Sequence, residues 1–171
     1  MRQFWKGLRR LALWFDTLFE TLAVSALTLM TLIVTIQVIT RKVFNFVFMW
    51  SEEITLLLLI WSGFMGVAVG FRDHLHIAMG SFAKILPKPL QRALDKIIPF
   101  SVFLFGLFLV KYGTEFTILM HANKLPATEM PVSVQYGIMP ITGVMTCIYG
   151  LIQLAGINTA RHLELEEEIP E

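Results

Sequence analysis

Four long apolar stretches alternate with short polar segments along the chain, at residues 17–40, 54–71, 97–120 and 134–157. Crossing the hydrocarbon core of a bilayer takes about 20 helical residues, and each stretch is close to or above that length. Because the core offers no water, every backbone N–H and C=O must find its partner within the segment, which selects helices. The pattern predicts an all-α integral membrane protein with four transmembrane helices, in a single membrane domain covering residues 1–171.

The first fifteen residues have a different, two-sided pattern. On a helical wheel the apolar side carries Phe4, Trp5, Leu8, Leu11, Ala12 and Phe15, and the opposite side carries Arg2, Gln3, Lys6, Arg9 and Arg10. Residues 1–15 therefore read as an interfacial amphipathic helix, with a basic tail of no fixed structure as the alternative. A cleaved signal is not expected, because Asp16 and Glu20 interrupt the apolar run and that run continues to Ile39.

The connection between the second and third stretches, residues 72–96, is amphipathic. Apolar residues recur with helical spacing from Leu90 to Ile98, Pro89 suits a first helical turn, and Pro87 ends any helix that comes from His76 through Leu86. We expect two short surface helices here. The basic residues that would meet lipid headgroups, here and at the N-terminus, are Arg2, Lys6, Arg9, Arg10, Lys84, Arg92 and Lys96. Pro99 and Pro140 either bend the third and fourth helices or are tolerated within them.

Basic residues outside the spans fall unevenly on the two sides of the membrane. Ten lie on the side of the N-terminus, and three, Arg41, Lys42 and Lys124, lie on the other. The excess marks the cytoplasmic side, so both termini are expected in the cytoplasm, including an acidic tail at residues 158–171.

Composition narrows the classes of function. The chain is 56% hydrophobic and 16% charged, with a mean hydropathy of +0.67, which is too apolar for a soluble enzyme domain. Cys147 is the single cysteine and forms no intrachain disulfide. The four histidines, His74, His76, His121 and His162, do not place two at mid-membrane depth, so neither haem nor zinc is expected. We expect no enzymatic activity, no cofactor, no metal and no nucleic-acid partner.

Charged residues in or beside the spans are the candidate functional positions. Lys111 and Glu115 lie four residues apart in the third stretch, where they could pair with each other, face a partner subunit or form an ion path. Glu52 and Glu53 begin the second helix, where the helix dipole favours anions. Capping explains one of them well, and the other could contact a partner.

The neighbourhood of these two glutamates also carries a family resemblance. Trp50-Ser51-Glu52-Glu53 is followed by Gly66, Arg72 and His76-Ile77, and later by Pro131, Tyr136 and Pro140. This order resembles the small permease (Q) subunit of tripartite ATP-independent periplasmic (TRAP) transporters. One departure is Val132-Ser133-Val134, where family members often carry a tryptophan.

The resemblance implies a division of labour in a bacterial inner membrane. A large elevator-type subunit would hold the substrate and sodium sites, a periplasmic binding protein would deliver an organic acid such as sialic acid or a C4-dicarboxylate, and this chain would be the non-catalytic scaffold of a heterodimer. The candidate contacts with the large subunit are Trp50, Glu52, Glu53, Gly63, Gly66, Gly70, Arg72, His76, Lys111 and Glu115.

Two other classes of function remain open. One is a self-sufficient small ion-coupled or proton-coupled transporter that uses Lys111 and Glu115 as a relay. The other is a membrane anchor subunit of a redox complex, which would bind haem.

Overall fold

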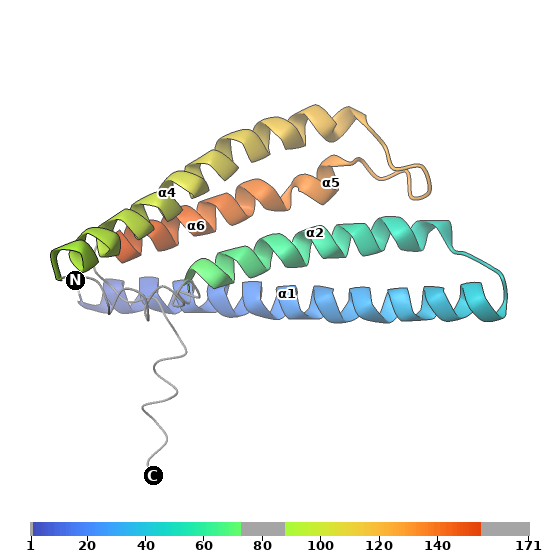
Figure 1. Cartoon of the computed structure of the whole chain (residues 1–171), viewed down its shortest axis with the longest axis horizontal. Helices are drawn as coiled ribbons and strands as arrows, with labels where there is room; N and C mark the ends of the chain where they lie inside the picture. Colours follow the sequence, from blue (N-terminus) through green and yellow to red (C-terminus); the bar gives the residue numbers. More distant parts are fainter. Residues whose placement is uncertain (1, 73–87, 155–171) are drawn as a thin grey trace, which may run out of the picture. The chain divides into compact units, whose positions relative to one another are not determined.

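A computed structural model describes the backbone of residues 2–72 and 88–154, and the side chains from residue 16 onward within these ranges, apart from 88–92 and 95. Over these residues the fold is helical, with a single isolated bridge between Lys124 and Pro131. The elements are α1 (Arg2–Val43), α2 (Met49–Arg72), α4 (Lys88–Leu119), the 3-10 turn η2 (Met120–Ala122), α5 (Ser133–Tyr136) and α6 (Ile138–Leu154) (Figure 1).

Four segments are long and apolar enough to cross a membrane: Asp16–Val43, Met49–Arg72, Lys96–Ala122 and Ser133–Leu154. The prediction of an all-helical chain with four such helices is confirmed. Contacts divide the described residues into two compact units, one made of the chain up to Val69 together with Thr117–Ile138, the other of Gly70–Phe116 together with the chain from Met139 on. The single membrane domain therefore stays a prediction.

The N-terminal residues do not form a separate helix. Residues 2–15 are the first turns of α1, which continues unbroken to Val43. Nothing in the backbone pattern stops the helix at residue 15, because no Pro or Gly occurs between residues 8 and 43. The predicted place of residues 1–15 at the membrane interface stays a prediction.

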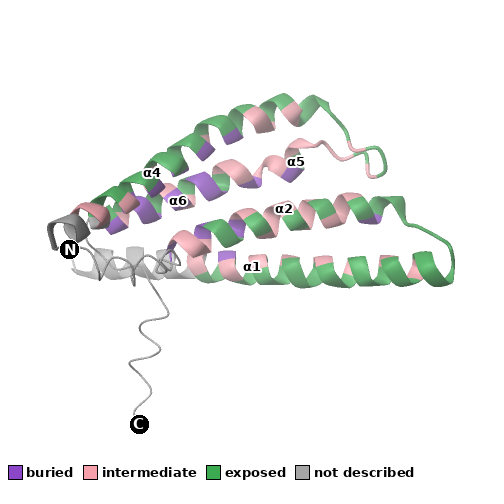
Figure 2. Ribbon diagram, viewed as in Figure 1, coloured by how far each residue is buried: buried purple, intermediate pink, exposed green. Residues whose placement is uncertain are grey.

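The side chains of α1 suit exposure to lipid. None of the residues in its most apolar stretch is buried within the chain, and Figure 2 shows α1 largely in the colour of exposed residues. Its hydroxyl groups donate to backbone carbonyls of the preceding turn, as Thr28 does to Val24 O at 2.8 Å and Thr35 to Thr31 O at 2.8 Å. These hydroxyl groups are thus satisfied inside the helix.

The predicted second surface helix is also part of a longer one. α4 begins at Lys88, holds Pro89 in its first turn and continues through Pro99 to Leu119. Pro99 removes one N–H from the helix ladder without ending the helix. The amphipathic segment Leu90–Ile98 is therefore the start of α4, and the helix expected at residues 76–86 lies outside the described residues.

Glycines bring α4 and α6 together in the second unit. A Cβ added to Gly143 would lie 2.7 Å from Val110 N, one added to Gly106 would lie 2.7 Å from Cys147 Sγ, and one added to Gly150 would lie 2.9 Å from Phe103 N. The two helices run side by side, and buried residues gather where they face each other (Figures 1 and 2). Small residues allow this close approach, and van der Waals contact is a main force between helices in a membrane.

The fourth span is interrupted between α5 and α6. Pro140 has no N–H to give to the Tyr136 carbonyl four residues earlier, and that carbonyl accepts Thr117 Oγ1 at 3.2 Å instead. The Val134 carbonyl, in the same turn, accepts Trp61 Nε1 at 3.1 Å. Side chains from α4 and α2 thus satisfy carbonyls around the break, as a membrane environment requires.

Candidate functional site

Glu53 holds the connection between η2 and α5 against the start of α2. Its Oε1 accepts the backbone N–H of Ala127 at 2.7 Å, and its Oε2 accepts both the N–H and the hydroxyl of Thr128, at 2.8 and 2.6 Å. A carboxylate offers enough lone pairs for all three donors. Glu53 therefore has a role within the chain, joining segments that lie 74 and 75 residues apart.

The connection that Glu53 holds is folded back on itself. Leu125 N–H donates to Met130 O, and Val132 N–H donates to Asn123 O, both at 2.9 Å. Glu129 closes the turn with φ of 56°, in the left-handed region, which non-glycine residues adopt at some cost. These bonds give the Ala127–Thr128 backbone a defined orientation toward the carboxylate.

Glu52 is neighbouring in sequence but different in setting. It is exposed, and its contact to the chain is a long one, with Gln37 Nε2 donating to Oε1 at 3.4 Å. In the first turn of α2 it meets the positive end of the helix dipole. Of the two glutamates, Glu52 is the one whose carboxylate is open to a second molecule. Its contact with a partner stays a prediction, whereas Glu53 makes contacts within the chain.

An aromatic segment leads into these glutamates. Rings of Phe46 and Phe48 lie 4.9 Å apart edge to face, and those of Phe48 and Trp50 lie 5.8 Å apart. Trp50 is 49% exposed. Exposed aromatic residues at the junction of two membrane-length helices are typical of the belt at a membrane–water interface.

Two of the three candidate glycines on α2 face open space. A Cβ added to Gly63 or Gly66 would meet nothing within 4 Å. Gly70 belongs to the second unit and is half-buried. The glycines that pack within the chain are instead those of α4 and α6, so the interface role of Gly63, Gly66 and Gly70 stays a prediction.

Lys111 and Glu115 do not pair with each other. Both are exposed on α4, and in the part of the chain that the structure describes neither makes an ion pair. The Lys111 ammonium lies 5.3 Å from the centroid of the neighbouring Tyr112 ring, a cation–π contact that leaves the charge without an anion. The interpretation of an intrachain pair is therefore not supported.

The remaining candidates sit elsewhere. Arg72 ends α2 with a side chain 2% exposed, next to Phe71, whose carbonyl accepts Gln153 Nε2 at 2.8 Å. Its role in a partner contact stays a prediction, as does that of His76, which lies outside the described residues.

Of the residues predicted to meet lipid headgroups, Lys96 is exposed. The side chains of the other six lie outside the described part: Arg2, Lys6, Arg9, Arg10, Lys84 and Arg92. Over the described residues no three His, Cys, Asp or Glu side chains gather to hold a metal ion.

Comparisons with known proteins bear on the family of this chain. The family model described as tripartite ATP-independent periplasmic transporters, DctQ component, matches residues 30–159. A putative TRAP transporter small permease protein of Haemophilus influenzae is 28% identical over 139 residues, which are 81% of this chain and 86% of that protein. The sialic acid TRAP transporter permease protein SiaT of the same species is 25% identical over 77 residues, which are 45% of this chain and 12% of that longer protein. With the family model covering most of the sequence, the chain belongs to the DctQ component family and is the small permease of a tripartite ATP-independent periplasmic transporter.

Proposed function

We propose that this small permease is the non-catalytic scaffold of a sodium-driven transporter in a bacterial inner membrane. It packs against a large elevator-type subunit, which takes up an organic acid delivered by a periplasmic binding protein. Sialic acid is the substrate that we favour, because part of the chain is similar to a protein described as a sialic acid permease; a C4-dicarboxylate is the alternative. The basic residues favour cytoplasmic termini.

The exposed charges of α4 are the observation that carries the packing proposal. Lys111 lies eleven residues before Ala122, the end of its candidate span, or about 16 Å along the helix. A lysine at such depth and a glutamate one turn nearer that end, both exposed and not paired with each other, are costly against lipid. A polar surface of a partner subunit on this face of α4 removes that cost.

The similarity to SiaT gives independent support. The matching 77 residues make up 12% of that permease protein, so a segment like this chain occurs there within a much longer polypeptide. A small permease that is separate in sequence is then expected to associate with its larger counterpart. The open side of α2 at Gly63 and Gly66 offers a second surface where another helix could approach closely.

Copurification with the large subunit tests the interface on α4. Lys111→Leu strands a partner anion in the contact; since breaking a buried pair costs about 3–5 kcal/mol, we expect copurification to fall at least about tenfold. Lys124→Leu, which removes an exposed lysine outside the spans, is the matched control and should copurify as the wild type does. Wild-type recovery of Lys111→Leu, at equal membrane levels, would show that α4 does not use this charge for assembly.

Reconstitution tests the scaffold role itself. Liposomes that contain this chain alone should not accumulate sialic acid or C4-dicarboxylates under a sodium gradient, whereas liposomes with both subunits and the binding protein should. Uptake by the chain alone that is lost in Glu115→Gln would support the relay of a self-sufficient transporter and overturn the proposal.

A further inference from the structure

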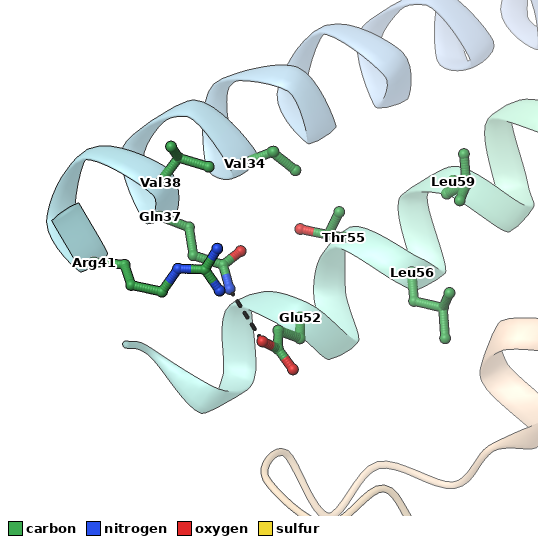
Figure 3. Close-up of a pocket in the computed structure, with 8 residues that line it drawn as sticks. All are labelled: Val34, Gln37, Val38, Arg41, Glu52, Thr55, Leu56 and Leu59. Carbon is green, nitrogen blue, oxygen red and sulfur yellow. Dashed lines mark hydrogen bonds between the residues drawn. The ribbon is translucent and has the colours of Figure 1, made fainter. Parts of the chain in front are cut away.

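A groove of about 340 Å³ opens between α1 and α2, within the first unit. Figure 3 shows four polar side chains directed into it from both helices: Gln37 and Arg41 from α1, and Glu52 and Thr55 from α2. The other four lining residues are apolar: Val34, Val38, Leu56 and Leu59. The groove therefore combines charged and hydrocarbon surface.

The two kinds of surface are separated along the groove. The charged residues Arg41 and Glu52 lie near the facing ends of the two antiparallel helices, two residues before Val43 and three after Met49. Val34 and Leu59 are each seven residues further into the spans, or about 10 Å at the rise of a helix. The groove is thus polar at the helix ends and apolar toward the membrane interior, which is the polarity of a phospholipid.

The charged end of the groove has unused binding capacity. Among the described residues Arg41 and Glu52 form no ion pair with each other or with another group, and Glu52 accepts only the 3.4 Å contact from Gln37. The hydroxyl oxygen of Thr55 is buried and has no hydrogen-bond partner. A guanidinium, a carboxylate and an unsatisfied hydroxyl consequently share one opening.

The depth of this opening matches lipid headgroups. The segment joining α1 to α2 carries Phe44, Phe46 and Phe48, and Trp50 follows in the first turn of α2. All four side chains are exposed, as in the aromatic belt of a membrane interface. Arg41 and Glu52 flank that segment, so we expect their charged groups at the depth of the lipid phosphates.

We propose that the groove binds one phospholipid with an ethanolamine headgroup. Arg41 binds the phosphate, because its fork of N–H donors matches phosphate oxygens. Glu52 accepts the ammonium, which carries three N–H donors. An acyl chain lies along Val38 and Leu56. Choline offers no N–H donor to Glu52, and the glycerol headgroup offers only neutral hydroxyl groups, so ethanolamine fits this pair of charges best. This site is separate from the α4 contact proposed above and does not rest on it.

Native mass spectrometry of the purified transporter complex, titrated with phosphatidylethanolamine and phosphatidylglycerol of identical acyl chains, tests the charges one at a time. Glu52→Gln should lower the preference for ethanolamine about tenfold while glycerol lipid binds as before, since it replaces a charge-assisted hydrogen bond. Arg41→Met should weaken both lipids. Lys42→Met, next to Arg41 but outside the groove, should bind as the wild type does. An unchanged lipid preference in Glu52→Gln, or equal effects of Arg41→Met and Lys42→Met, overturns the proposal.

Photocrosslinking identifies the occupant without relying on these charges. A photoreactive amino acid at Leu56, in the complex within native membranes, should label phospholipid. Labelling of the large subunit in place of lipid would mean that the groove is a protein interface, and would overturn the proposal while leaving the α4 contact standing.

Discussion

At the scale of single residues, the adjacent carboxylates of Glu52 and Glu53 make different contacts. The oxygens of Glu53 accept hydrogen bonds from the backbone N–H groups of Ala127 and Thr128 and from the Thr128 hydroxyl. Glu52 has an exposed carboxylate, which accepts a long hydrogen bond from Gln37. The difference follows from their positions on α2, because a rotation of about 100° between consecutive residues turns the two side chains toward different neighbours.

Glu53→Gln is expected to loosen the connection at residues 123–132. A glutamine keeps one acceptor oxygen but presents an NH₂ group, a donor, to at least one of the three donors. Limited proteolysis of the purified chain should cut within residues 123–132 severalfold faster, and the thermal midpoint should fall by a few degrees. Glu52→Gln is the matched control and should leave both measurements near wild type. Equal effects of the two substitutions would contradict the role of Glu53 in holding residues 123–132.

At the scale of elements, the break between α5 and α6 depends on a donor from another helix. Thr117→Val removes the hydroxyl that reaches the Tyr136 carbonyl at nearly constant shape. We expect a loss of about 1 kcal/mol in unfolding free energy, the size of such bonds in membrane proteins. Thr114→Val, whose hydroxyl bonds Val110 O of its own helix, should cost less.

A double-mutant cycle isolates the cause. Pro140→Ala restores an N–H that can reach the Tyr136 carbonyl, so Thr117→Val should cost less in the Pro140→Ala background than alone. Additive effects in reversible unfolding would show that the proline and the threonine act independently.

A packed glycine of the α4–α6 contact and an open glycine of α2 give predictions that differ in sign. Gly143→Ala places a methyl group 2.7 Å from Val110 N and 2.9 Å from Leu109 Cβ, so the helices must separate, at a cost of about 1–3 kcal/mol. Gly63→Ala meets open space and should leave stability unchanged or raise it by up to about 1 kcal/mol through helix propensity. Unfolding in mixed micelles measures both, and a silent Gly143→Ala would be at odds with this packing.

At the scale of the whole molecule, four membrane-length helices and an uneven charge distribution predict the topology. In a Cys147→Ser background, Lys124→Cys should react with a membrane-impermeant thiol reagent in intact spheroplasts, and Lys88→Cys should react only after permeabilisation. These positions lie on opposite sides of the third span, and equal labelling of both would contradict the four-span, N-inside arrangement.

The sequence by itself determined the spans and the helical fold, because a long apolar run and its self-contained backbone bonds are local properties. It also named Glu52, Glu53, Lys111 and Glu115 among the candidate positions for a partner contact, and these roles stay predictions. The spacing of apolar residues from Leu90 to Ile98 predicted a separate surface helix, and this prediction was wrong. The segment is the start of α4, which continues past Pro99.

Tertiary structure alone decided which side chains meet across the chain. The bond from Thr128 to Glu53 spans 75 residues and that from Trp61 to Val134 spans 73, and no periodicity encodes such pairings. Gly63, Gly66 and Gly70 were named from the sequence as candidate contacts, whereas the glycines that meet a neighbouring helix include Gly106, Gly143 and Gly150, which were not named. Only the approach of a neighbouring backbone distinguishes a glycine that is packed from one that is open, because that approach depends on atoms far away in the sequence.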